Sequence, residues 1–404
     1  MTSHITPHNT AITRPLFALP QDVTYLDGNS LGPLPHAAKS RVADRIQDEW
    51  GAMLITAWNR AGWMDEPARI SARIARLIGA EPDHVTLGDT LSLRLYQALH
   101  AALSLAPQDR REVITDSGNF PSDLYMAQGL LDTLNAGHTL RVVAPEQVET
   151  AISDQTAVLM LTQVDYRTGA KHDMTALTAK AHKAGALTVW DLAHSAGAIP
   201  VDLTAAQADF AVGCTYKFLN GGPGAPAFLY AAPRHAGGVQ PALRGWLGHA
   251  QPFDFTPDYR PAAGINRFRV GTPPVLAMAA LDAALDAFDD TDMAALHSTA
   301  ITLSERLING VANHAPELRL ASPADPMRRG AQVSFRHPDA YAICQALIAN
   351  GVIGDFRAPD ILRFGITPLY TTCDDMDRAV QTLADVMKTR AWDRPEYHAR
   401  NAVT

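Results

Sequence analysis

The sequence is poor in cysteine and has no long apolar segment. Its 404 residues include three cysteines, Cys214, Cys344 and Cys373, which lie far apart and outside any C-x-x-C spacing. This pattern predicts neither a disulfide framework nor a zinc site, and we expect no metal. No apolar run is long enough to cross a bilayer, and the polar first residues (MTSHITPHNTAITRP) lack the apolar core of a signal peptide. We therefore expect a cytoplasmic protein with no membrane partner.

The sequence also lacks the features of proteins that bind polyanions or nucleotides. The formal net charge is −8, and the basic residues are scattered rather than clustered. This balance argues against nucleic acid as a partner. A nucleotide-binding α/β protein is a weak alternative, because the sequence has no G-x-G-x-x-G after its first strand and no Walker sequence.

What the middle of the chain does contain is an alternation of short apolar runs and helical stretches. We expect strands at residues 85–88, 112–115, 140–143, 157–164, 187–191, 210–213 and 227–231, with helices between most of them. Strands that alternate with helices form right-handed crossovers, so the sheet should be mostly parallel and covered on both faces. After about residue 275, long helical stretches lead into short strands, which is typical of a smaller α+β domain.

These patterns predict an α/β fold in three parts. Residues 1–75 form an N-terminal segment that packs on the large domain or on a partner subunit. Residues 76–275 form a large domain with a mostly parallel seven-stranded sheet flanked by helices, and residues 276–404 form a small C-terminal α+β domain.

Polar residues that follow the predicted strands are candidates for the functional site, because ligands of such sheets bind beyond the carboxyl ends of the strands. Asp191 ends one strand and His194 follows it; Lys217 follows the next strand, between an aromatic residue and a glycine-rich turn (TYKFLNGGPG). A lysine amine adds reversibly to the aldehyde of pyridoxal phosphate, and a carboxylate keeps the pyridine nitrogen of that cofactor protonated. Alone, Asp191 could cap a helix and Lys217 could be a surface lysine, but the ordered set favours a pyridoxal-phosphate site.

Taken together, these segments resemble the fold-type I pyridoxal-phosphate enzymes of the aminotransferase class-V group, and more narrowly the kynureninase family. The resemblance extends over nearly the whole chain, through the motifs DGNSLG, WNRAGW, GNFPSD, VDYRTG, WDLAHSAG, YKFLNGGPG, GWLGH and FRVGTPP. The lysine segment alone supports only the superfamily, whereas GNFPSD, GWLGH and GTPP in this order are specific to the kynureninase family.

The resemblance implies that residues 76–275 bind pyridoxal 5′-phosphate and that Lys217 carries it. Phe120 would stack on the pyridine ring, and Tyr216, Trp246 and Thr272 would donate hydrogen bonds to the phosphate, Thr272 across a homodimer interface. The helix start at Leu91 and Ser92 suits the anionic phosphate, although a one-residue slip in the alignment would place Thr90 in that pair. The full set implied for the cofactor is Leu91, Ser92, Phe120, Pro121, Ser122, Asp123, Thr162, Asp191, His194, Tyr216, Lys217, Trp246 and Thr272.

The resemblance also implies a substrate and a reaction. Arg363 would clamp the substrate α-carboxylate through a bidentate pair, with a surface strand-edge arginine as the alternative. Trp63 and Asn29 either line the substrate pocket or belong to core and turn. The implied reaction is the hydrolysis of L-kynurenine, or of 3-hydroxy-L-kynurenine, to L-alanine and anthranilate or 3-hydroxyanthranilate, with Lys217 and Tyr216 as the catalytic residues.

Two alternatives keep the same fold and change the function. A cysteine desulfurase or selenocysteine lyase needs a nucleophilic cysteine on a mobile loop, and Cys344 falls inside a predicted helix while Cys373 falls at a helix start. A regulatory protein that had lost catalysis would be expected to lack Lys217, Asp191 or Arg363, and all three are present.

Overall fold

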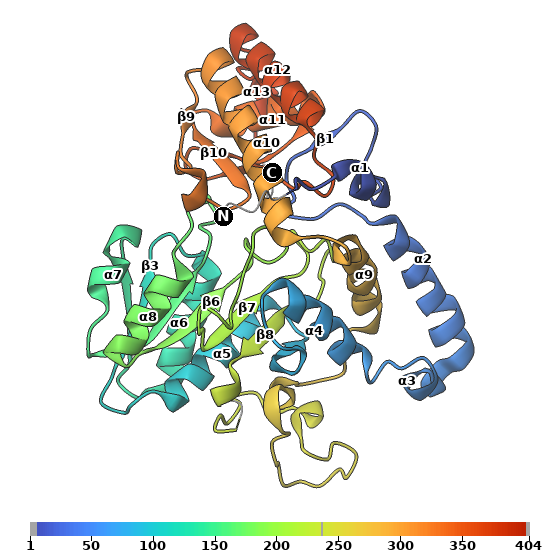
Figure 1. Ribbon diagram of the computed structural model, residues 1–404, viewed down its shortest axis with the longest axis vertical. Coiled ribbons are helices and arrows are strands. Elements are labelled where there is room, and N and C mark those ends of the chain that lie inside the picture. Colours follow the sequence, from blue (N-terminus) through green and yellow to red (C-terminus); the bar gives the residue numbers. More distant parts are fainter. Residues whose placement is uncertain (1–5, 236, 401–404) are drawn as a thin grey trace.

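The computed structural model describes residues 6–235 and 237–400, and its central feature is a seven-stranded sheet with helices on both faces (Figure 1). The spatial order of the strands is β2-β8-β7-β6-β5-β3-β4. Their bounds are β2 Val85–Leu87, β3 Glu112–Asp116, β4 Thr139–Val143, β5 Thr156–Thr162, β6 Leu187–Asp191, β7 Phe210–Gly213 and β8 Phe228–Ala231. Strands β4, β3, β5, β6 and β7 run parallel, whereas β8 is antiparallel to both β7 and β2. The predicted fold class is confirmed.

Alternation along the strands explains why both faces of this sheet are covered. In β5, Val158 and Met160 pack with α5 and α6, whereas Leu159 and Leu161 belong to the core on the opposite face. Successive strand residues point to opposite faces, so a strand that is apolar throughout needs a helical layer on each side. The helices of the large sheet and its surroundings are α4 Glu66–Leu77, α5 Leu91–Leu105, α6 Pro121–Leu134, α7 Val148–Ala151, α8 Met174–Ala184 and α9 Val275–Leu285.

The C-terminal part, orange to red in Figure 1, is built on a smaller antiparallel sheet of order β12-β13-β10-β9. The strand bounds are β9 Arg319–Leu320, β10 Gln332–Arg336, β12 Asp355–Arg357 and β13 Ile361–Gly365, and the helices are α10 Met293–His314, α11 Ala340–Ala349, α12 Cys373–Thr389 and α13 Pro395–His398. Register places Asp355 directly opposite Arg363 across the β12–β13 pair. This pairing determines the surroundings of the candidate substrate-binding arginine.

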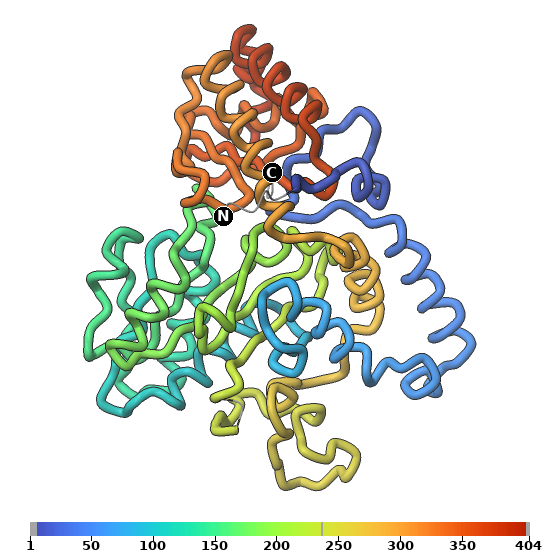
Figure 2. Tube along the Cα trace, in the orientation of Figure 1, coloured from blue at the N-terminus to red at the C-terminus, as the bar shows by residue number. Residues whose placement is uncertain are grey.

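The N-terminal segment contacts both parts of the molecule, and Figure 2 traces it in blue along one side. Its elements are α1 Thr10–Thr13, β1 Thr24–Tyr25, α2 His36–Asp44 and α3 Ala57–Arg60, with a π-helical stretch at Arg45–Met53. Strand β1 pairs in parallel with β11 (Val352–Ile353) of the C-terminal part, and α2 packs on α9. The boundaries at residues 75 and 275 remain predictions, and the two chain ends lie partly outside the described residues.

Within residues 6–235 and 237–400, no helix combines the length and the apolar character needed to cross a membrane.

Candidate active site

Lys217 lies in a tight turn after β7. The turn is closed by Asn220 N, which donates to the carbonyl of Lys217 over 2.8 Å, and by Gly221 N, which donates to the carbonyl of Thr215 over 2.8 Å. The turn also accepts a donor from the N-terminal DGNSLG segment, because Gly32 N binds the carbonyl of Tyr216 over 2.8 Å. A Cβ at Gly32 would lie 2.6 Å from the backbone oxygen of Lys217, so only glycine allows this close approach.

Two polar side chains from β6 and the turn after it surround the lysine. Nζ of Lys217 lies 3.0 Å from Nε2 of His194. Burial, together with the charge of Lys217, lowers the pKa of His194 well below its usual value, so the imidazole is neutral near pH 7. Burial raises the pKa of Asp191 to about 6, although Lys217 opposes the shift. Asp191 is held in place by Ala193 N at 2.9 Å and by the Thr162 hydroxyl at 3.3 Å.

The helix starts of α5 and α6 meet beside this cluster. Ser92 and Ser122, each the second residue of its helix, have their hydroxyl oxygens 3.0 Å apart. Thr90 and Leu91 share a cavity of about 330 Å³ with Tyr216, which places both alternatives for the phosphate turn near the lysine. Helix N-termini present free backbone N–H groups and positive dipole ends, a setting that suits a phosphate.

An aromatic ring faces the lysine from the start of α6. The ring of Phe120 is 42% exposed, lies 5.9 Å from Nζ of Lys217, and makes an edge contact with Tyr166 at 5.1 Å between ring centroids. Pro121 follows as the first residue of α6, where its fixed φ suits a helix start. Asp123, one turn into α6, is completely buried, and burial together with the charge of Asp191 raises its pKa well above the usual value.

Unpartnered polar atoms mark this cluster as a ligand site. Both carboxylate oxygens of Asp123 and Nδ1 of His194 are buried without a hydrogen-bond partner among the described residues. Such atoms cost free energy unless a ligand satisfies them. A reactive amine, two buried acids, an open aromatic face and two helix N-termini match the aldehyde, the ring and the phosphate of pyridoxal phosphate. The residues present therefore fit that cofactor.

Arg363 lies in the interior strand β13 and is 1% exposed, so it is not a surface arginine. Its Nε donates to Asp355 over 2.6 Å, and its Nη2 donates to Asp355 and to Ser30, the latter over 2.9 Å. Its Nη1 donates to the carbonyl of Tyr166. Asp355 thus occupies the Nε–Nη2 edge of the guanidinium, one of the two edges that can bind a carboxylate bidentately.

Asn29 lies in the same region. It is fully buried against Gly365 of β13, and neither its amide nitrogen nor its amide oxygen has a partner among the described residues. The same DGNSLG segment also contacts the Lys217 turn, through Gly32 N and the Tyr216 carbonyl.

Three other predicted residues have their contacts elsewhere in the single chain. Trp246, 39% exposed, makes an edge contact with Phe253 and lines a cavity with His249 and Tyr259. Thr272 lies in a small pocket beside the turn that precedes α5. Trp63 packs edge-on against Trp58 and donates its indole N–H to Glu49 over 2.5 Å.

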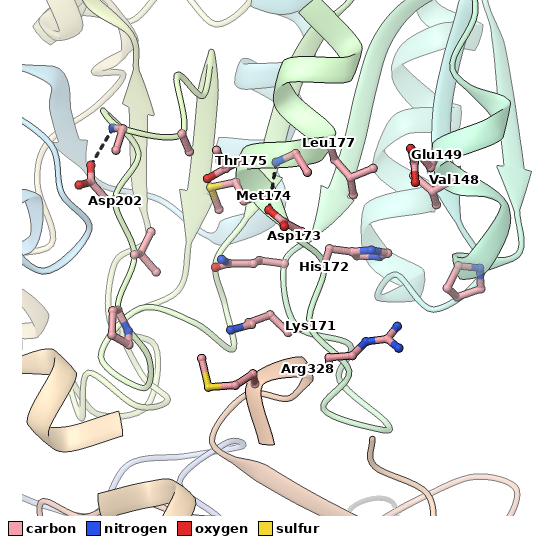
Figure 3. Close-up of a pocket in the computed structure, with 18 of the residues that line it drawn as sticks. Val148, Glu149, Lys171, His172, Asp173, Met174, Thr175, Leu177, Asp202 and Arg328 are labelled. Atoms are coloured by element: carbon pink, nitrogen blue, oxygen red, sulfur yellow. Dashed lines mark hydrogen bonds between the residues drawn. The ribbon is translucent and has the colours of Figure 1, made fainter. Parts of the chain in front are cut away.

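A separate cavity of about 760 Å³ lies outside this cluster (Figure 3). Lys171, His172, Arg328 and the first turn of α8 line it, and Figure 3 shows Asp173 and Asp202 pointing toward backbone N–H groups that they cap. None of the predicted site residues is among the described residues of its wall.

Comparison with known proteins gives concordant results. The family model of the kynureninase C-terminal domain matches residues 296–383. The kynureninase of Pseudomonas fluorescens is 48% identical over 397 residues, which cover 97% of this chain and 95% of the relative. The kynureninase of Burkholderia mallei strain SAVP1 is 48% identical over 398 residues, with the same coverage.

The chain belongs to the kynureninase family.

Solved structures with the same fold have other activities in their names. The cysteine desulfurase of Escherichia coli aligns with a TM-score of 0.79 at 20% identity, covering 95% of this chain and 99% of its own. The cystine C–S lyase C-DES, solved with its product cysteine persulfide, aligns with a TM-score of 0.78 at 19% identity, covering 90% and 98%. Identities this low show the shared fold alone, so they do not favour the desulfurase alternative over the kynureninase family.

Several residues that contact the candidate site residues were not singled out in the sequence. Asp27 and Ser30 belong to DGNSLG, and Tyr166 belongs to VDYRTG. Asp355 and Arg357 belong to the segment GDFR, which precedes Arg363 in the chain. The unusual density of charge in GDFR, inside an otherwise apolar stretch, was the available signal. The sequence did not reveal that Ser30 contacts this segment, because Ser30 and Asp355 are 325 residues apart along the chain.

Proposed function

We propose that this chain hydrolyses the Cβ–Cγ bond of L-kynurenine, giving anthranilate and L-alanine, as a step of tryptophan catabolism. 3-Hydroxy-L-kynurenine, which would give 3-hydroxyanthranilate, is the second candidate substrate. The observation that carries the proposal is the family membership over 97% of the chain, joined to a Lys217–His194–Asp191 cluster at the carboxyl ends of the parallel strands.

Pyridoxal phosphate, when bound, supplies an aldehyde that captures the substrate amine and a pyridinium ring that accepts electrons. Lys217 would hold it covalently, and Asp191 would pair with its ring nitrogen. Phe120, Asp123, Thr162 and His194 would contact its ring. Leu91, Ser92, Pro121, Ser122 and Tyr216, with Trp246 and Thr272, would complete its surroundings.

Two residues would move protons. Lys217, once displaced by the substrate amine, would remove the proton from the substrate Cα. His194, a neutral acceptor 3.0 Å from Nζ, would hold the Lys217 amine in position for this step. Tyr216 would donate a proton to the substrate Cβ after the bond breaks. Burial, with Cys214 and Asp191 nearby, raises the pKa of Tyr216 above its usual value, so the hydroxyl keeps its proton at neutral pH.

The substrate end of the site would be formed by Arg363 for the α-carboxylate and by Asn29 and Trp63 for the rest of the molecule. The contacts of Trp246, Thr272 and Trp63 within one chain are to residues other than Lys217, so we assign them to the site of a second copy, in a homodimer with shared active sites. We further propose a cytoplasmic enzyme that needs no metal, with its cofactor domain at residues 76–275.

The experiment uses the purified holoenzyme, L-kynurenine and the fluorescence of anthranilate. The wild type should show the absorbance band of a lysine-bound cofactor and release anthranilate, and Lys217→Ala should lose both. Lys171→Ala, in the cavity of Figure 3, is the matched control and should keep both. Sulfide release from L-cysteine in place of anthranilate release would favour a desulfurase, with the exposed Cys373 as its nucleophile.

A further inference from the structure

Asn119 connects segments whose residues are assigned to the cofactor. It lies in the turn after β3 and is 4% exposed. Its Oδ1 accepts hydrogen bonds from Phe120 N over 2.7 Å and from the hydroxyl of Thr162 at the end of β5. Its Nδ2 donates to Oγ1 of Thr115 over 3.1 Å. Each polar atom of this buried amide therefore has a hydrogen-bond partner.

The backbone N–H of Phe120 determines which way this amide points. A backbone N–H can only donate, so the amide atom that faces it must be the oxygen. The Thr162 hydroxyl reaches the same oxygen and must therefore be the donor in that contact. A hydroxyl has one hydrogen, and the hydrogen of Thr162 is thus directed at Asn119.

The direction of that hydrogen matters for Asp191. The Thr162 oxygen lies 3.3 Å from Oδ2 of Asp191, and it would donate there if Asn119 did not accept its hydrogen. The other oxygen of this carboxyl, Oδ1, accepts from Ala193 N over 2.9 Å. Burial raises the pKa of Asp191 to about 6, and a hydrogen bond from Thr162 would oppose that rise. By accepting the hydrogen, Asn119 keeps Asp191 more basic.

We propose that Asn119 is a positioning residue for the ring of pyridoxal phosphate. It keeps the Thr162 hydrogen away from Asp191, so that the carboxylate holds the ring nitrogen in its protonated form. A protonated ring accepts electrons more readily than a neutral one. This inference rests on the proposed function for its cofactor, but it requires no particular substrate, because ring protonation serves any amino acid that reacts on this cofactor.

The test is a double-variant cycle in the holoenzyme. It compares Asn119→Ala, Thr162→Val and the double variant with Asn309→Ala, the matched control at an exposed position on α10. The first readout is the chemical shift of the ring nitrogen in isotopically labelled pyridoxal phosphate, which separates the protonated ring from the neutral one. The second is the dissociation constant of the cofactor, from equilibrium dialysis. Thermal melting establishes that each variant is folded.

In Asn119→Ala, the Thr162 hydroxyl loses its acceptor and turns to Asp191. The ring-nitrogen shift should then move toward that of a neutral ring, and the dissociation constant of the cofactor should rise by about 3- to 10-fold, the range of one hydrogen bond. In the Thr162→Val background, Asn119→Ala should not move the ring-nitrogen shift further, because no hydroxyl is left to turn. The loss of cofactor affinity should be smaller there, and Asn309→Ala should match the wild type.

An equal change of the ring-nitrogen shift in both backgrounds would overturn the proposal, because the effect would not pass through the Thr162 hydroxyl. No change in either background would also overturn it. Failure of the proposed reaction has a different signature: the wild type does not cleave L-kynurenine, yet its labelled cofactor still reports ring protonation, and the two backgrounds still decide the role of Asn119. A chain that bound no pyridoxal phosphate would overturn both proposals.

Discussion

Tyr216 is adjacent to the reactive lysine in the chain, and its ring lies 5.7 Å from Nζ of Lys217. A tyrosine whose pKa is raised by burial is a proton donor rather than an acceptor over the neutral range. Its chemical role and its expected hydrogen bond to the cofactor phosphate both use the same O–H, so cofactor binding must be measured separately from catalysis.

We expect Tyr216→Phe to keep the cofactor absorbance band and to slow L-alanine formation by about 10²- to 10⁴-fold, the usual contribution of a positioned general acid. Rapid-quench measurement of L-alanine and anthranilate checks this. Tyr125→Phe, an exposed tyrosine on α6, serves as the control and should be normal. Alanine formation at the normal rate in Tyr216→Phe would remove the proton-donor role.

At the residue scale, the sequence predicted what local order determines. Asp191, His194 and Lys217 follow neighbouring strands, and parallel strands bring their carboxyl ends to one edge, so their proximity followed from the strand pattern. The ion pair between Asp355 and Arg363 did not, because it depends on the register of the β12–β13 hairpin. A shift of one residue in that register would separate the two side chains.

At the scale of elements, the buried Asp209 connects three elements at the amino-terminal end of the central strands, opposite to the end that carries Lys217. Asp209 precedes β7 and accepts hydrogen bonds from His182 at the end of α8, His235 and Arg234, each at 2.7 Å, and from Thr188 N of β6 at 2.8 Å. Burial would raise the pKa of Asp209, but these donors hold it far below its usual value. Its stabilising contribution is therefore present above the unfolded-state pKa and is lost as the pH falls through the folded-state pKa.

We expect Asp209→Asn to lower the free energy of unfolding by about 3 kcal/mol at pH 7, because it breaks a buried charge network. The difference from the wild type should shrink as the pH falls below about 4, where the unfolded carboxyl is protonated. Thermal and urea unfolding at several pH values measure it. Asp377→Asn, at an exposed pair with Arg306, should change little, and a difference that grew in acid would contradict the assignment.

The elements themselves were predicted unevenly, for identifiable reasons. Between the strands expected at 112–115 and 140–143, the helix is α6, and α8 ends at Gly185 in the left-handed conformation that a glycine favours. Between the strands expected at 140–143 and 157–164, the helix α7 is short, since Pro145 begins a 3-10 turn before it and Ile152 is extended after it. The antiparallel direction of β8 had no local signal, because strand direction is determined by the connections rather than by composition.

At the scale of the whole molecule, the proposed site divides its residues between two copies of the chain. Lys217→Ala removes the reactive amine of one site, whereas Thr272→Ala is assigned to the phosphate of the other. Mixing the two variants and refolding them together should therefore restore one intact site per mixed dimer, or about a quarter of the wild-type activity after random pairing. Anthranilate fluorescence measures the recovery, and light scattering measures the mass.

Each variant alone, refolded in the same way, is the control and should show at most a small residual activity. No recovery in a mixture that light scattering shows to be dimeric would contradict the assignment of Thr272 to the neighbouring copy. Contacts between copies, like contacts between distant residues such as Thr24 and Val352, give no signal in the local sequence. Only the structure or the family resemblance reveals them.

The β1–β11 pair has a consequence for how the protein is made. The ribosome releases residues 24–32 early, but their partners Val352, Asp355 and Gly365 emerge only near the end of synthesis. A nascent chain that stops before β11 already contains Lys217, Asp191 and His194, yet its DGNSLG segment still lacks those partners. The substrate end of the site is thus completed only after the small sheet has been synthesised, which makes these contacts late events in the folding of the chain.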